Sequence, residues 1–211
     1  MMKYLILFLS AMVLMVGCEA EVNESITIET NRNVDKDLYT INGDIIIGDH
    51  CVINGALKSI NGRIEIGRES KVEDIKSING QVKIAENSKV AESVTVINGA
   101  VTLKANAVVG QDVNTVNGSI RLVRARVLGN VFTVNGDVFL EDKALVVGSI
   151  VVKGKTGEDE KRKVEIFLND SSVVEGNIDG QKAENTQILV YLDGSSQIKG
   201  DVINAELVYK K

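Results

Sequence analysis

The sequence predicts an all-β protein: a single parallel, right-handed β-solenoid of about ten coils of 18–19 residues, with two longer coils near the C-terminus. Three observations support this prediction. Asn-Gly pairs recur at almost fixed spacing, aliphatic residues keep fixed places between the pairs, and no stretch after Cys18 shows the sustained 3.6-residue apolar stripe of a helix. The pairs begin at residues 42, 61, 79, 98, 117 and 135, in steps of 18 or 19.

The aliphatic residues predict where each strand lies. In the unit that contains "SINGRIEIG", the aliphatic positions are Ile60, Ile64, Ile66, Val72 and Ile75, before Ile78 starts the next unit. A leading strand of this kind is expected to start near residues 26, 45, 64, 82, 101, 120, 138, 166, 190 and 207. One coil offers about six inward aliphatic side chains, too few to offset an ordering cost of ~1–2 kcal/mol per residue. The coils must therefore stack.

The recurring asparagine predicts a shape rather than a chemistry. Stacked carboxamides donate to and accept from one another along such a rod, so we expect an asparagine ladder. The glycine that follows each asparagine is expected to supply a positive φ at the corner. A catalytic or metal-binding role for these asparagines is disfavoured. They are Asn42, Asn61, Asn79, Asn98, Asn117 and Asn135.

The N-terminus predicts export. A short basic start at Lys3 precedes an apolar run over residues 4–16, which is too short to span a membrane, and Gly17 precedes Cys18. The segment "MVGC" resembles the lipobox of bacterial lipoproteins. The resemblance implies a signal peptide over residues 1–17, acylation of Cys18, a lipidated tether over 18–23 and a solenoid domain over 24–211. Glu19, rather than aspartate, after the cysteine implies outer-membrane sorting. The alternative is an ordinary cleaved signal with an incidental cysteine.

Composition disfavours several classes of partner. The net charge is −5, and removal of residues 1–17, which hold one lysine and no acid, makes it −6, so no nucleic-acid partner is expected. With Cys18 acylated, Cys51 is the remaining thiol, and no internal disulfide can form. The single histidine, His50, adjoins Cys51. Adjacent residues on a strand point to opposite faces, so His50 and Cys51 are not expected to form a catalytic dyad. One histidine and one thiol make no zinc site by themselves, and no metal or cofactor is expected.

The surface offers one candidate binding face. The outward residues of the leading strands form a file: Ile46, Glu65, Lys83, Thr102, Arg121, Phe139, Phe167 and Tyr191. Its last three members are expected to stack as an aromatic ladder that could hold a glycan or a protein partner, and Glu65 and Lys83 are expected to be opposite-charge neighbours. Alternatively, the insertions at residues 153–163 and 179–187 fold over the rings.

An enzyme is the less favoured alternative. Some β-solenoids cleave polysaccharides, and the pairs Asp44/Glu65 and Asp137/Glu141 place carboxylates near one another. No compact acidic group with a basic partner recurs at one height, however, and we assign no catalytic residue.

The repeats themselves resemble known bacterial domains. "TVNGSIRL", "TVNGDVFL" and "SINGRIEI" are similar to the coils of adhesin-like β-solenoid domains and of bactofilins, the polymer-forming cytoskeletal proteins. The resemblance implies either a non-enzymatic envelope lipoprotein that binds envelope or surface partners, or a scaffold that self-associates end to end. Bactofilins are generally cytoplasmic, so the lipobox favours the first.

Overall fold

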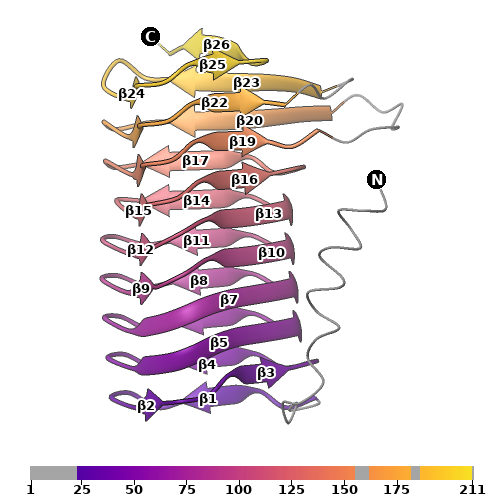
Figure 1. Ribbon diagram of the computed structural model, residues 1–211, viewed down its shortest axis with the longest axis vertical. Helices are drawn as coiled ribbons and strands as arrows, with labels where there is room; N and C mark the ends of the chain where they lie inside the picture. Colours follow the sequence, from indigo (N-terminus) through magenta and orange to yellow (C-terminus); the bar gives the residue numbers. More distant parts are fainter. Residues whose placement is uncertain (1–22, 155–161, 182–185, 211) are drawn as a thin grey trace.

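The chain folds as a β-solenoid of parallel stacked coils. The computed structural model describes residues 23–154, 162–181 and 186–210, and within these ranges every regular element is a strand. The strands build about nine turns (Figure 1). The predicted fold class is therefore confirmed. No helix in the described ranges is long and apolar enough to cross a bilayer.

One side of the rod is a ten-stranded parallel sheet in which each leading strand pairs with that of the next coil. Its strands are, in order, β1 (Ile26–Ile28), β4 (Ile45–Ile47), β6 (Ile64–Ile66), β8 (Val82–Ile84), β11 (Val101–Leu103), β14 (Ile120–Val123), β17 (Val138–Glu141), β20 (Arg162–Leu168), β23 (Thr186–Leu192) and β26 (Glu206–Tyr209). The ten predicted recurrences are all present, although β20 and β23 begin four residues earlier than expected.

The other two sides form a second parallel sheet of sixteen strands. Its strands are β2 (Asn33–Val34), β3 (Leu38–Thr40), β5 (Val52–Asn61), β7 (Lys71–Asn79), β9 (Lys89–Val90), β10 (Val94–Asn98), β12 (Val108–Val109), β13 (Val113–Asn117), β15 (Arg126–Val127), β16 (Val131–Thr133), β18 (Leu145–Val146), β19 (Ile150–Val152), β21 (Val173–Val174), β22 (Ile178–Gly180), β24 (Gln197–Ile198) and β25 (Val202–Ile203). β5 and β7 cover two sides of their coils without a break, since β7 pairs with both β9 and β10.

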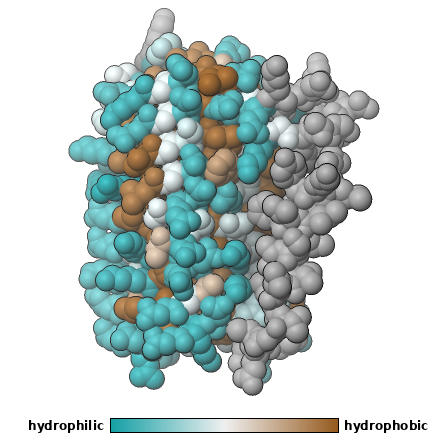
Figure 2. Space-filling model, viewed as in Figure 1, coloured by the Kyte–Doolittle hydropathy of each residue, from teal (hydrophilic) through white to brown (hydrophobic). Residues whose placement is uncertain are grey.

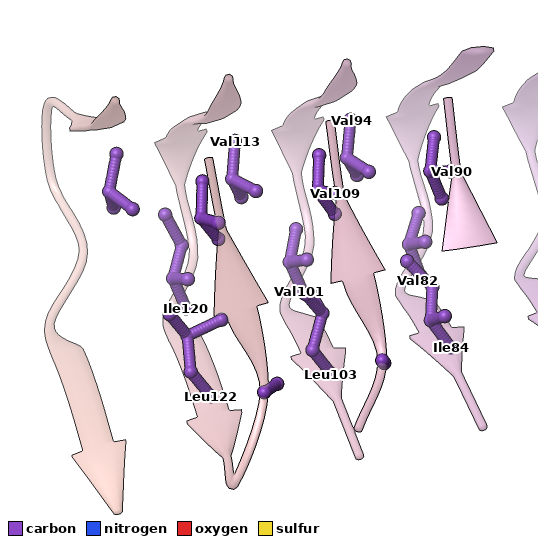
Figure 3. Packing of buried hydrophobic residues seen from close by; sticks show 14 of the residues in the cluster. Val82, Ile84, Val90, Val94, Val101, Leu103, Val109, Val113, Ile120 and Leu122 are labelled. Atoms are coloured by element: carbon purple, nitrogen blue, oxygen red, sulfur yellow. The ribbon is translucent and has the colours of Figure 1, made fainter. Parts of the chain in front are cut away.

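The core is a column of aliphatic side chains that repeats from coil to coil. Val82, Ile84, Val90 and Val94 of one coil lie below Val101, Leu103, Val109 and Val113 of the next, and all eight side chains are buried (Figure 3). This repetition explains why one coil cannot fold alone: each layer covers its neighbours.

One predicted part of the core is wrong. Ile60, Ile78 and their counterparts lie outside the core cluster and are half-buried, whereas the preceding Ser59 is fully buried. Strand alternation explains the swap, because the inward serine places the following isoleucine on the outer face. The buried hydroxyl is satisfied locally: Ser59 Oγ donates to the carbonyl of Gly62 at 3.2 Å.

The predicted reason for the glycine row is also wrong. Of the described glycines only Gly118 has a positive φ, 151°. The constraint is instead close approach between coils: a Cβ on Gly62 would lie 1.9 Å from the carbonyl oxygen of Gly43, and one on Gly80 would lie 2.0 Å from that of Gly62. Most residues with a left-handed backbone lie at a different corner, and those of its first six coils are not glycine: Asn31, His50, Glu69, Asn87, Asn106 and Arg124.

The two insertions end as paired strand. Arg162 pairs with Thr186 and Lys163 with Gln187, so β20 and β23 extend into segments that we predicted to be loops. The remainder of the insertions, 155–161 and 182–185, lies outside the described residues, as do residues 1–22 with the predicted signal peptide and Cys18. Whether the insertions cover the aromatic rings therefore stays a prediction.

Candidate functional site

The Asn-Gly corner carries a continuous ladder of hydrogen bonds. Each carboxamide donates through Nδ2 to Oδ1 of the asparagine one coil nearer the N-terminus. From Asn61 to Asn135 all five of these distances are 2.8 Å. Asn42 donates in turn to Asn23 at 2.5 Å, which adds a rung at the same 19-residue spacing, although Glu24 rather than glycine follows Asn23.

Both ends of this asparagine ladder are defined. At the C-terminal end the guanidinium of Arg162 donates to Asn135 Oδ1 at 2.6 Å and to the carbonyl of Val134 at 2.8 Å. The ladder thus stops where the first insertion returns to the rod. A further Asn-Gly pair, Asn54-Gly55, lies outside the ladder beside a register shift between Ile53 and Ala56, and its asparagine donates to Asp35 at 2.6 Å.

The three aromatic residues of the last coils stack face to face. Phe139 and Phe167 have ring centroids 5.1 Å apart and an interplanar angle of 2°; for Phe167 and Tyr191 the values are 4.7 Å and 6°. Register pairing of β17, β20 and β23 places these residues directly above one another. All three side chains are half-buried, because each ring covers its neighbour.

Cations and a register neighbour lie against this aromatic ladder. The Arg121 guanidinium lies 4.3 Å from the Phe139 ring centroid, on the open side of the stack. Lys210 Nζ lies 4.7 Å from the centroid of Phe167 and 5.5 Å from that of Tyr191, beside the stack, and Val208 is the register neighbour of Tyr191. A sugar ring stacks on an open aromatic face, so the ladder offers ring edges and charges rather than a stacking platform.

Charged groups line the edge of the aromatic ladder. Tyr191 donates its hydroxyl to Glu165 at 3.0 Å, and this bond raises the pKa of the Tyr191 phenol. Lys163 lies 2.7 Å from the same carboxylate; it lowers the pKa of Glu165, and its own pKa is raised in return. Arg121 also pairs with Glu141. The rim is therefore ionic and mutually paired.

A file of outward aliphatic residues was missed by the sequence reasoning. It runs beside the asparagine ladder, one residue before each asparagine, and its members are half-buried and not packed against the core. The signal that could have found it is strand alternation, which turns the serine, threonine or valine just before each member inward. The members of this aliphatic file are Ile41, Ile60, Ile78, Ile97, Val116 and Val134. Figure 2 shows that hydrophobic and hydrophilic residues form files along the rod.

The two side chains considered for a catalytic dyad, His50 and Cys51, contact other residues. His50 is exposed and lies 3.4 Å from Glu69, whereas Cys51 is buried and its thiol donates to the carbonyl of Glu29 at 3.1 Å. Among the described residues no group of three or more His, Cys, Asp or Glu side chains could hold a metal ion.

The carboxylate pairs proposed for glycoside chemistry also have other contacts. Arg63 lies between Asp44 (3.2 Å) and Glu65 (3.7 Å). Glu65 thus contacts this arginine, although Lys83 is its register neighbour as predicted.

Comparison with protein-family models, curated proteins and solved structures finds no significant match. The fold therefore rests on the structure itself, and the binding surfaces are argued from their chemistry.

Proposed function

We propose that this chain is a lipid-anchored, non-enzymatic protein of the bacterial cell envelope, held in the outer membrane through Cys18, whose solenoid binds a protein partner. The lipobox-like segment "MVGC" supports the anchor. The solenoid supports the binding role, because a rigid rod holds a surface at a fixed distance from its anchored end.

The aromatic ladder with its ionic rim is the observation that carries the proposal. It lies in β17, β20 and β23, toward one end of the rod. The anchored chain would enter at the opposite end, at β1 (Figure 1). Aromatic rings and arginine are enriched at protein interfaces, whose rims are polar. Because the ring faces are covered, a protein partner fits this surface better than a stacked glycan.

Site-specific photo-crosslinking in the producing cell tests this binding surface. A benzophenone amino acid at Tyr191 is expected to give a discrete protein adduct, and the same residue at Thr102, in the same outward file, is the matched control. Adducts at both positions, or at neither, would argue against the aromatic ladder as the interface. Mass spectrometry of the mature N-terminus tests acylation of Cys18 separately.

End-to-end assembly is the second candidate, and the open sheet edges favour it. Within the described residues β1 pairs with β4 alone and β26 with β23 alone, so each end of the rod presents an unpaired strand edge. Light scattering and negative-stain microscopy of the chain that starts at Glu19 test this candidate. Filaments several rods long would support a scaffold, and a monomer across a wide concentration range would exclude end-to-end assembly.

A further inference from the structure

One edge of the rod is free of carboxylates over four consecutive coils. Four outward files meet there, and we call them together the ladder edge. They consist of Lys58, Lys76, Thr95 and Asn114; Ile60, Ile78, Ile97 and Val116; Asn61, Asn79, Asn98 and Asn117; and Arg63, Gln81, Ala100 and Ser119. In a chain with 29 acidic and 24 basic residues, these sixteen positions hold three basic residues and no acidic one.

The carboxylates of the same coils lie elsewhere on the rod. Lys58 and Lys76 lean away from the aliphatic file toward Asp37 and Asp74, each at 2.7 Å, and Arg63 contacts Asp44. The acidic residues of these coils that lie off the ladder edge are Glu65, Glu69, Glu73, Asp74, Glu86, Glu92 and Asp112. The ladder edge is thus the side on which this acidic protein can approach an anionic surface.

The backbone groups along the ladder edge form hydrogen bonds between neighbouring coils. Asn61 N donates to the carbonyl of Ile41 at 2.7 Å, and Gly62 N donates to that of Asn79 at 3.1 Å. The carboxamides also bond along the rod, each Nδ2 donating to the asparagine one coil nearer the N-terminus. A surface whose polar groups are already paired loses little on contact with an apolar medium, whereas unpaired groups there are costly.

The position of the proposed anchor adds a geometric reason. Asn23 forms the first rung of the asparagine ladder, so the chain enters the rod at the foot of the ladder edge. Cys18 precedes Asn23 by five residues, and five extended residues span at most about 17 Å. The bilayer that holds the lipid is therefore present at this edge at high effective concentration.

We propose that the ladder edge is a membrane-contact surface: the lipid-anchored rod lies along this edge on the anionic headgroups of the leaflet that holds its acyl chains. The aliphatic file enters the interfacial region, and the ladder edge presents no carboxylate to the lipid phosphates, because Lys58, Lys76 and Arg63 pair with the carboxylates beside it. This inference rests on the proposed lipid anchor. It leaves the aromatic ladder, which belongs to the ten-stranded sheet, free for a protein partner.

Depth-dependent quenching tests the orientation of the rod. The full lipoprotein is reconstituted in vesicles of phosphatidylcholine and phosphatidylglycerol that carry a headgroup-level quencher lipid. An environment-sensitive dye is attached to Ile97→Cys, Thr102→Cys or Gln111→Cys, which lie in β10, in β11 and between β12 and β13. Protein without an introduced cysteine measures background labelling, which is expected to be small because Cys51 is 0 % exposed. We expect severalfold stronger quenching at position 97 than at the other two.

The competing outcomes are distinguishable. Equal quenching at the three positions would mean that the rod stands upright, and stronger quenching at 102 or 111 would mean that another side faces the lipid; either overturns the inference. Energy transfer between dyes at position 97 of two molecules, without lipid quenching, would assign the edge to a second copy instead. Failure of the protein to float with vesicles would refute the lipid anchor itself, and the inference with it.

A pair of charge variants adds a second readout. Ile78→Glu places a carboxylate in the aliphatic file and is expected to reduce quenching of the dye at position 97 severalfold. Thr102→Glu makes the same change of charge on the ten-stranded sheet and is expected to leave that quenching unchanged. An equal effect of the two variants would show that net charge, rather than the ladder edge, governs the approach to the membrane.

Discussion

Replacement of Gly99 by alanine is expected to destabilise the rod through a backbone collision. A Cβ on Gly99 would lie 2.2 Å from the carbonyl oxygen and 2.6 Å from the carbonyl carbon of Gly80, one coil below. Neither neighbour is a flexible side chain, so the strain cannot be relieved by a change of rotamer. The φ of Gly99 is not positive, and left-handed backbone strain therefore adds nothing.

The magnitude follows from the distance that must open. To move the Cβ from 2.2 Å to the 3.0 Å below which real contacts essentially never fall, the coils must part locally by about 0.8 Å. Gly80 N donates to the carbonyl of Asn98 at 3.0 Å beside the collision, and the same separation would break this bond. Overpacking of about 1–3 kcal/mol and one lost hydrogen bond give about 2–4 kcal/mol, which is roughly 4–16 °C in Tm for a domain of this size.

Thermal and urea unfolding followed by circular dichroism measure this loss. Gly194→Ala is the matched control, because no atom lies within 4 Å of the new Cβ. The control is expected to be neutral or to gain a few tenths of a kcal/mol from reduced freedom of the unfolded chain. If Gly99→Ala and Gly194→Ala unfold at the same temperature, close approach between coils is not the reason for the glycine row.

Three further expectations concern other parts of the rod. Asn98→Ala removes two rungs of 2.8 Å and is expected to cost about 1 kcal/mol in urea unfolding, whereas Asn114→Ala, outside the ladder, is expected to cost less. Burial alone would raise the pKa of Asp193, but hydrogen bonds from Ser196 and nearby backbone amides lower it to about 2. The folded pKa lies below the ordinary value of 3.8, so this stabilisation is lost as pH falls from about 4 to about 2; Asp193→Asn should flatten acid unfolding over that window. Cys51 is expected to react with a thiol reagent at the rate of local opening, and fast reaction in the folded state would contradict its burial.

The solenoid could be predicted because its period is visible in the sequence. Asparagine, glycine and aliphatic positions return every 18 or 19 residues, and a unit that cannot bury its own core must stack. The register then follows from the repeat, which is why the outward file from Ile46 to Tyr191 could be read without coordinates.

The inside and outside of the Asn-Gly corner could not be assigned from hydrophobicity. "SING" places serine inward and isoleucine outward, against the usual preference of both residues. The inversion is stable because the serine hydroxyl finds a carbonyl within the same turn, as Ser59 does with Gly62. Strict alternation continued from Val94 and Val96 would have found it, since both are inward and Ile97 follows them.

The chemistry of the rod changes at one height. The asparagine ladder ends at Asn135, where Arg162 closes it, and the aromatic ladder begins four residues later at Phe139. A repeat that served only to hold itself together would have no reason to exchange one ladder for the other. The exchange divides the rod into an N-terminal part, with a partly aliphatic, carboxylate-free edge near the proposed anchor, and a C-terminal part with stacked rings in an ionic rim. Two surfaces of different chemistry at opposite ends of one rigid body are what a protein needs to contact a membrane and a protein partner at the same time.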